Sequence, residues 1–94
     1  MGLRRRRRII EGQIFQKREY ERTAPDIVEF VVHLGLGGPF NLIEIDRLAT
    51  MLMRKIRYSS LPIEEVRDLI VNCDGMVSRF YRVEIIQDKF VRVK

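Results

Sequence analysis

The sequence predicts a small α+β domain in which three helices precede a C-terminal antiparallel hairpin. Residues Arg79–Ile86 and Phe90–Lys94 are rich in aromatic and β-branched side chains, which favour strands. Between Thr23 and Cys73, apolar residues recur in three segments at the spacing of an amphipathic helix. With 94 residues and 46% apolar content, the chain is long enough for one domain with a modest core.

A three-residue turn, Gln87 to Lys89, gives the hairpin a clean core face. This turn pairs Ile86 with Phe90, Ile85 with Val91, Glu84 with Arg92, and Val83 with Val93. Because strand side chains alternate, the core face then holds Tyr81, Val83, Ile85, Val91 and Val93, and the outer face holds Arg82, Glu84, Ile86, Phe90, Arg92 and Lys94. A two-residue turn at Asp88-Lys89 would mix both kinds of residue on each face. The three-residue turn is therefore predicted, although it holds no glycine.

The first two helices are expected on either side of a short strand. The first begins at Thr23, a candidate N-cap, and ends before Gly35; its β-branched run leaves a strand as the alternative. Phe40–Leu42 forms the short strand, a third member of the sheet. The second helix is capped by Asn41, and Glu44 completes a capping box. Its apolar stripe consists of Ile45, Leu48, Ala49, Leu52, Met53 and Ile56.

The third helix is expected to open at Pro62, after a loop at Tyr58–Ser60. Its core-facing residues are Ile63, Val66, Leu69, Ile70 and Cys73. Before the loop, Arg54, Lys55 and Arg57 cluster at the expected end of the second helix. Their charge either matches the helix dipole, the favoured interpretation, or provides a phosphate contact.

Three helices, a strand between the first two and a terminal hairpin resemble the winged-helix family. The resemblance covers about residues 24–94 and is carried by Phe40–Leu48, Leu61–Ile70 and the hairpin. It implies a winged helix-turn-helix fold, and many members bind DNA with the third helix in the major groove and the hairpin wing on the backbone. Here the third helix carries Glu64, Glu65 and Asp68, which would repel phosphates lining that groove.

A fainter likeness is to the N-terminal lobe of RNA 2′-phosphotransferases. In that family a similar helix leads to an Asp…Arg-Phe hairpin, which is similar to Asp74…Arg79-Phe80 here. The family's Arg-His pair late in the first helix is replaced by Val32-His33. The chain also leaves no room for the family's NAD-binding lobe, so transferase activity is not implied.

Positive charge is concentrated at the two ends of the chain. Residues 1–24 hold eight basic and three acidic side chains, residues 25–74 five and eight, and residues 75–94 five and two. Residues 1–23 are expected to form a basic N-terminal arm, partly disordered because its like charges repel, and residues 24–94 the folded domain. Arginine binds phosphate through a planar fork of donors, and aromatic side chains stack on bases. Both ends are therefore suited to nucleic acid.

The favoured function is that of a nucleic-acid-binding protein and transcriptional regulator, with DNA favoured over RNA as the partner. The candidate binding residues are Arg4, Arg5, Arg6, Arg7, Arg8, Lys17, Arg18, Arg22, Arg79, Phe80, Arg82, Phe90, Arg92 and Lys94. The alternative is a winged-helix protein–protein interaction or assembly module, a homodimer included, which the acidic third helix favours. On that alternative the outer hairpin face is solvated and carries a Glu84–Arg92 pair.

Several classes of function are not expected from this composition. One cysteine, Cys73, and one histidine, His33, give neither a metal-ligand pattern nor a nucleophile–base pair, so no enzyme, metal or cofactor is expected. No apolar run reaches the length of a membrane span, and no apolar stretch follows the arginines as in a signal peptide. A single cysteine fits a reducing compartment, so a cytoplasmic protein is expected.

Overall fold

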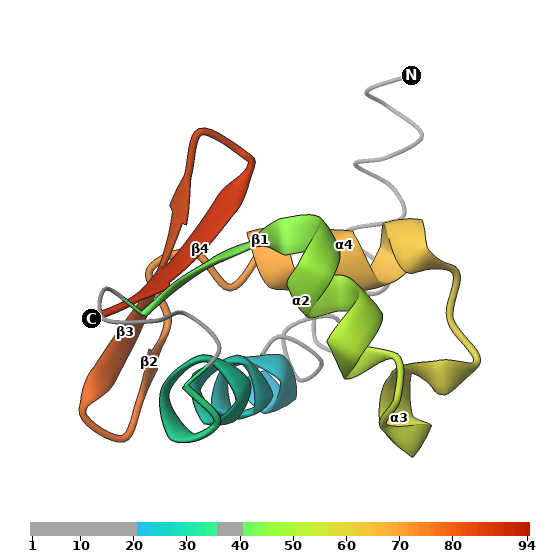
Figure 1. Ribbon diagram of the computed structural model, residues 1–94, viewed down its shortest axis with the longest axis horizontal. Coiled ribbons are helices and arrows are strands. Elements are labelled where there is room, and N and C mark those ends of the chain that lie inside the picture. Colours follow the sequence, from blue (N-terminus) through green and yellow to red (C-terminus); the bar gives the residue numbers. More distant parts are fainter. Residues whose placement is uncertain (1–20, 36–40) are drawn as a thin grey trace.

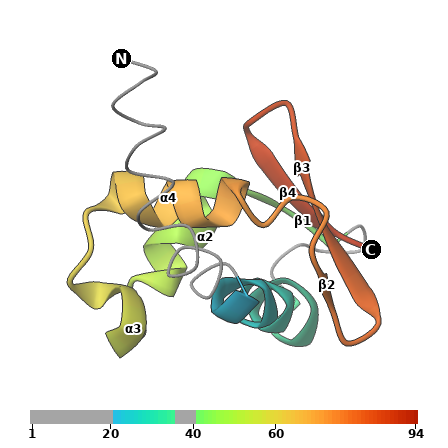
Figure 2. The ribbon, with the colours of Figure 1, turned by 180° about the vertical axis from the view of Figure 1, so that it is seen from behind.

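The computed structural model describes residues 21–35 and 41–94, which form an α+β structure with four helices and one antiparallel sheet. The first helix covers residues 21–33, and its last five residues, Glu29–His33, are π-helical. It is followed by β1 (Leu42–Glu44), α2 (Ile45–Leu52), α3 (Ile56–Ser59), α4 (Ile63–Val71), β2 (Val77–Ser78), β3 (Tyr81–Ile86) and β4 (Phe90–Val93). The described helices all lie on one side of the sheet (Figures 1 and 2).

The sheet has the strand order β1-β4-β3-β2, and the predicted hairpin register is confirmed. Val83 pairs with Val93, Glu84 with Arg92, Ile85 with Val91, and Ile86 with Phe90. The predicted third strand is present as β1, which begins two residues later than expected and pairs with β4. The period-two alternation of β3 and β4 therefore specifies which face of the sheet meets the helices.

The turn between β3 and β4 is built without glycine. Gln87 and Asp88 both adopt positive φ angles, 54° and 52°. The carbonyl of Lys89, in the same turn, accepts a 2.8 Å hydrogen bond from the backbone N–H of Ile45. Since Ile45 is the first residue of α2, this bond satisfies one of the donors that a helix start leaves unpaired, and it attaches the helix to the hairpin.

A second hairpin, β2–β3, was not predicted. Val77 pairs with Arg82 and Ser78 with Tyr81, so Arg79 and Phe80 form a two-residue turn. The expected strand Arg79–Ile86 therefore starts two residues too early. Before β2, the Asp74 carboxylate accepts a 2.9 Å hydrogen bond from the backbone N–H of Ile85, so the edge of β3 that extends beyond β2 is capped by a side chain.

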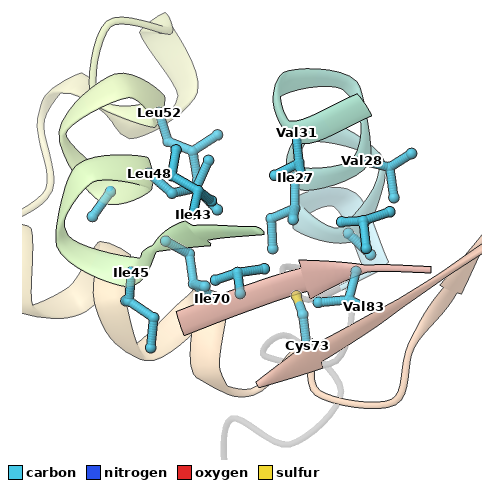
Figure 3. Close-up of a cluster of buried hydrophobic side chains, with 14 of the residues drawn as sticks. Ile27, Val28, Val31, Ile43, Ile45, Leu48, Leu52, Ile70, Cys73 and Val83 are labelled. Carbon is cyan, nitrogen blue, oxygen red and sulfur yellow. The ribbon is translucent and has the colours of Figure 1, made fainter. Parts of the chain in front are cut away.

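The core lies between the sheet and the helices. Figure 3 shows Ile27 and Val31 of the first helix, Leu48 of α2 and Ile70 of α4 directed toward one another above the sheet. Val83 of β3 faces this group and is fully buried. The other predicted inward residues of the sheet behave alike: Val91 and Val93 are buried, and Tyr81 and Ile85 pack against the core.

The first two predicted helix starts are wrong, whereas the third agrees to within one residue, since α4 begins at Ile63 directly after Pro62. Glu21 and Arg22 are already helical, and Thr23 is fully buried within the first helix. Asn41 has a φ of 51° and precedes β1, and α2 starts at Ile45 with no side-chain cap. Both residues are of a type that caps helices, but each makes another contact. Thr23 is buried in the interior. The backbone carbonyl of Asn41 accepts a hydrogen bond from Val93 of β4.

The second helix also ends earlier than the apolar stripe suggested. It stops at Leu52, and Ile56, expected in the core, opens the separate helix α3 and is 92% exposed. The expected loop at Tyr58–Ser60 overlaps α3, and Tyr58 is fully buried. In α4, Val66 and Ile70 are buried as predicted, whereas Ile63 is exposed. The aromatic ring of Tyr58 thus provides the core contact that Ile56 was expected to make.

Candidate nucleic-acid interface

The candidate interface is the outer face of the sheet, which no described helix covers (Figures 1 and 2). Its residues follow from the strand register, because paired residues share a face. They are Leu42, Glu44, Val77, Arg82, Glu84, Ile86, Phe90, Arg92 and Lys94. None of these side chains is buried, in contrast to the opposite face. The sheet therefore presents a mixed cationic and apolar surface.

Two cations on this face form a cross-strand pair. Arg82 and Lys94 exchange backbone hydrogen bonds of 2.9 and 3.0 Å, so their side chains emerge side by side from β3 and the end of β4. Both side chains are exposed. Among the described residues, neither makes an ion pair within 4.0 Å. Their charge is available to an external anion.

Arg92 has a different role, because it is paired with Glu84 across the strands. The Arg92 guanidinium donates to Glu84 Oε1 at 2.6 Å from Nη2 and 2.9 Å from Nε. This hydrogen bonding holds the pKa of the Glu84 carboxyl below its usual value. The cross-strand pair considered from the sequence is confirmed, and it reduces the charge that Arg92 offers to a ligand.

The two candidate aromatic side chains are not equivalent. Phe90 is half-buried on the sheet, and the ammonium of Lys89 lies 5.6 Å from the centre of its ring. Phe80 lies in the β2–β3 turn and is 94% exposed. Only Phe80 presents both ring faces to solvent.

The β2–β3 turn lies beside the end of the first helix. Ser78 and Arg79 line a hollow of about 130 Å³ together with Glu29 and His33. Figures 1 and 2 show the teal end of this helix next to β2 and its blue start away from the sheet. Arg22, the one described candidate of the basic arm, is exposed near that start, roughly 16 Å along the helix from His33 at 1.5 Å per residue. Arg22 and the hairpin are thus at separate ends of the molecule's first helix.

Two members of the basic cluster after α2, Lys55 and Arg57, form ion pairs with the first helix. Lys55 Nζ contacts the carboxylates of Asp26 at 3.1 Å and Glu29 at 3.0 Å, and Arg57 contacts Asp26 at 3.0 Å. These acceptors, Glu29 first, raise the pKa of Lys55 above its usual value. The cluster lies beyond the last residue of α2, so the favoured dipole role is wrong for that helix, and the ion pairs of Lys55 and Arg57 attach α3 to the first helix. The phosphate contact stays a prediction.

Tyr58, which is buried, also bonds the carboxylate of Asp26. Its hydroxyl donates a 2.5 Å hydrogen bond to Asp26 and lies 3.4 Å from the hydroxyl of Thr23. Burial, together with the carboxylate of Asp26, raises the pKa of Tyr58 to about 12. Sequence reasoning missed this network, since its only local signal was a tyrosine next to two serines.

The acidic character of the third predicted helix is confirmed. Glu64, Glu65 and Asp68 are all exposed on α4. Arg67 of the same helix is committed to Asp46 of α2, at 2.5 Å. The exposed side of α4 is therefore anionic, and it is unsuited to a phosphate backbone.

The described part of the chain shows how potential metal ligands are placed and where Cys73 lies. No three His, Cys, Asp or Glu side chains in residues 21–35 and 41–94 are grouped so as to hold a metal ion. Cys73 is buried in the core, and burial raises the pKa of its thiol to about 12. In the same part of the chain, no helix combines the length and the apolar character that crossing a bilayer requires.

The remaining candidate residues lie outside the described ranges. These are Arg4, Arg5, Arg6, Arg7, Arg8, Lys17 and Arg18. Comparison of the chain with protein-family models, with curated proteins and with solved structures found no match.

Proposed function

We propose that this chain is a nucleic-acid-binding protein with a winged-helix fold. The fold is supported by the order of elements, a helix, β1, α2, α4 and then the β3–β4 hairpin, and by the pairing of β1 with β4. On this proposal α2 and α4 form the helical pair and β3–β4 the wing, while α3 is the connection between the helices.

The observation that carries the proposal is the distribution of charge. Residues 1–20 hold seven basic and two acidic side chains, which accounts for the whole net charge of +5. The rest of the chain holds 11 of each sign and is neutral. Within that neutral part, Arg82 and Lys94, which form no ion pair with any residue that the structure describes, lie on the open face of the sheet. A polyanion is the partner that complements a segment of this charge density.

The exposed acids of α4 favour a binding mode in which this helix does not enter the major groove. Glu64, Glu65 and Asp68 would face phosphates there. The arm and the hairpin are left as the contact elements, with the arm supplying most of the electrostatic affinity. Binding of this kind is weakly selective for sequence, because phosphate contacts carry no base information.

The test is a titration of the full chain with labelled single-stranded and duplex DNA, and with the matching RNA, at several salt concentrations. A variant with serine in place of Arg4, Arg5, Arg6, Arg7 and Arg8 removes five charges. If each arginine contacts one phosphate, the slope of log affinity against log salt falls by roughly 3.5 to 4.5 in this variant. Arg47→Ala and Arg54→Ala, two exposed arginines away from the sheet, are the charge controls. Affinity that depends neither on salt nor on the arm would contradict the proposal.

The alternative, a protein-interaction or assembly module, is supported by a different surface. Ile56 at the start of α3 is 92% exposed, and the acids of α4 lie on the next helix. An exposed apolar side chain is typical of a protein contact, and the anionic face of α4 suits a basic partner. Sedimentation of the full chain and of Ile56→Asp over a range of concentrations tests self-association. Self-association that the substitution abolishes, without any salt-dependent DNA binding, would favour this alternative.

A further inference from the structure

The turn between β2 and β3 has two features that are unfavourable for folding stability. Arg79, its first central residue, has a φ of 58°, a conformation at which glycine is preferred in two-residue hairpin turns. Phe80, its second, is the most exposed large apolar side chain among the described residues, at 94%. Departures of this kind concentrate at functional sites, because function rather than stability selects the residue. The turn is therefore a candidate contact element in its own right.

Cations lie near this turn, and the carboxylates among them are held in ion pairs with other residues. Arg82 lies two residues after Phe80, about 7 Å along the strand, and Lys94 is its cross-strand neighbour. Glu84 is paired with Arg92 on the sheet, and Asp26 and Glu29, which line the hollow with Arg79, are paired with Lys55. Beyond the hydrogen bond from Arg92, Glu84 also interacts with Arg82 and Lys94 at longer range, which helps to lower the pKa of its carboxyl. With these pairs neutral, the charges of Arg79, Arg82 and Lys94 leave the surface around Phe80 net positive.

An exposed aromatic ring can stack on an unpaired base, and cations on either side of the ring can bind the phosphates next to that base. Base–aromatic stacking is insensitive to sequence, and the phosphates on either side of the base are held by the neighbouring cations. In a duplex the base faces are already stacked on one another, so a surface ring gains little there. The acidic α4 also disfavours insertion of the helix into a duplex groove. Phe90 does not serve the same purpose, since Lys89 lies over its ring.

We propose that the β2–β3 turn is a single-strand binding point, at which an unpaired base stacks on Phe80 and the adjacent phosphates contact Arg79, Arg82 and Lys94. This inference rests on the proposed nucleic-acid function and specifies its ligand. The basic arm supplies affinity for any polyanion, and the turn supplies the preference for single strands over duplexes.

The absence of tryptophan from the chain permits a direct stacking assay. Phe80→Trp introduces a sole tryptophan at the turn, and its fluorescence is quenched when a base stacks on it. Ile56→Trp places the same reporter at an equally exposed position on α3. With the full chain and a mixed-sequence single-stranded DNA, quenching is expected at position 80 and not at position 56. Equal quenching, or none at position 80 when anisotropy reports binding, overturns the proposal.

Affinity measurements separate stacking from charge. Phe80→Ala is expected to weaken single-strand binding by roughly 5- to 100-fold, the effect of losing one stacked base, and to change duplex affinity by less than about twofold. Ile56→Ala, the exposed control, is expected to change neither. An equal loss for both nucleic acids, or no loss, overturns the proposal.

Arg79→Gly distinguishes a binding role from a structural one. Glycine relieves the positive φ, so a purely structural turn would become more stable with unchanged binding. On the proposal the thermal midpoint rises while the single-strand salt slope falls by about 0.7, the effect of one lost phosphate contact. Salt-dependent binding that ignores Phe80 and Arg79 defeats this inference alone. A full chain that binds no nucleic acid defeats the proposed function as well.

Discussion

The hydroxyl of Tyr58 donates a 2.5 Å hydrogen bond to the carboxylate of Asp26, 32 positions earlier in the chain. Asp26 also accepts from Lys55 and Arg57, so three donors from one side of the molecule meet one carboxylate of the first helix. The carboxylate is 14% exposed, and the phenol ring is fully buried. The position of α3 against the first helix therefore depends on a partly buried polar network, in which each member needs the others to be satisfied.

Replacing Tyr58 with Phe should lower the free energy of unfolding by about 1 to 2 kcal/mol, since the ring still fills the core but Asp26 loses its buried donor. Tyr81→Phe is the matched control, because Tyr81 lies half-buried on the sheet. Its expected change is within about 0.5 kcal/mol. Urea unfolding followed by circular dichroism measures both. Equal losses in the two variants would show that the Tyr58 hydroxyl contributes nothing specific.

Stability should fall as the pH rises from 10 to 12, and Tyr58 should account for part of the fall. Its pKa is about 12 in the folded protein against 10.0 as the ordinary value. Between these values the unfolded chain has lost a proton that the folded chain retains, so raising the pH favours unfolding. This difference of two pKa units lowers the free energy of unfolding by about 2 to 3 kcal/mol over that pH range.

Comparison with Tyr58→Phe isolates this contribution. Phenylalanine does not titrate, so the variant should lose less stability than the parent between pH 10 and pH 12. The thiol of Cys73, whose pKa is also raised, is common to both proteins and cancels in the difference. Urea unfolding at pH 8, 10 and 12 gives the two curves. Equal losses of stability in the two proteins would mean that folding does not raise the pKa of Tyr58.

The sequence predicts the parts of the fold that depend on periodicity. The register of β3 and β4 follows from alternation together with a short turn, because a shift of one residue places charged residues in the core. The buried stripe of α2 follows in the same way from Ile45, Leu48, Ala49 and Leu52. These features are repeated over several residues, so one atypical residue does not obscure them.

Features that depend on a single residue or on distant contacts are not predictable in this way. The β2–β3 turn was missed because Arg79 adopts a positive φ without being Gly, Asn or Asp, so no turn signal marks it. Tyr58 was assigned to a loop because its partner, Asp26, lies in another helix. For the candidate site, strand alternation places Arg82 and Lys94 on the outer face. It also places Glu84 opposite Arg92, whose ion pair is confirmed, but it does not reveal that the ammonium of Lys89 lies over the ring of Phe90.

Substitution of Asp88 by Gly should stabilise the protein by about 0.5 kcal/mol, since Asp88 has a φ of 52° in the β3–β4 turn and glycine adopts this conformation without a steric penalty. Asp68→Gly is the matched control, an exposed aspartate inside α4. There glycine should cost roughly 0.3 kcal/mol, because its helix propensity is lower than that of aspartate by about this amount. The opposite signs in thermal or urea unfolding are the result to look for. Destabilisation by both would indicate that the Asp88 side chain itself supports the turn.

The Glu84–Arg92 pair should make Glu84 titrate below its ordinary value, because the guanidinium stabilises the charged carboxylate. A lowered folded pKa means that this contribution to stability is present above the unfolded pKa and is lost as the pH falls through the folded one. Carboxyl resonances followed by NMR from pH 7 to pH 2 give the midpoint. In Arg92→Gln the midpoint should move up toward 4.5.

Arg47→Gln, a charge-matched change at an exposed position on α2, should leave the Glu84 midpoint in place. The same pair also affects binding on the proposed function. Glu84→Gln releases Arg92 and should strengthen binding to single-stranded DNA at low salt, whereas replacing both residues with Gln should change it little because the pair as a whole is neutral. If the double substitution weakened binding as much as Arg82→Gln did, the pair would have to open when nucleic acid binds.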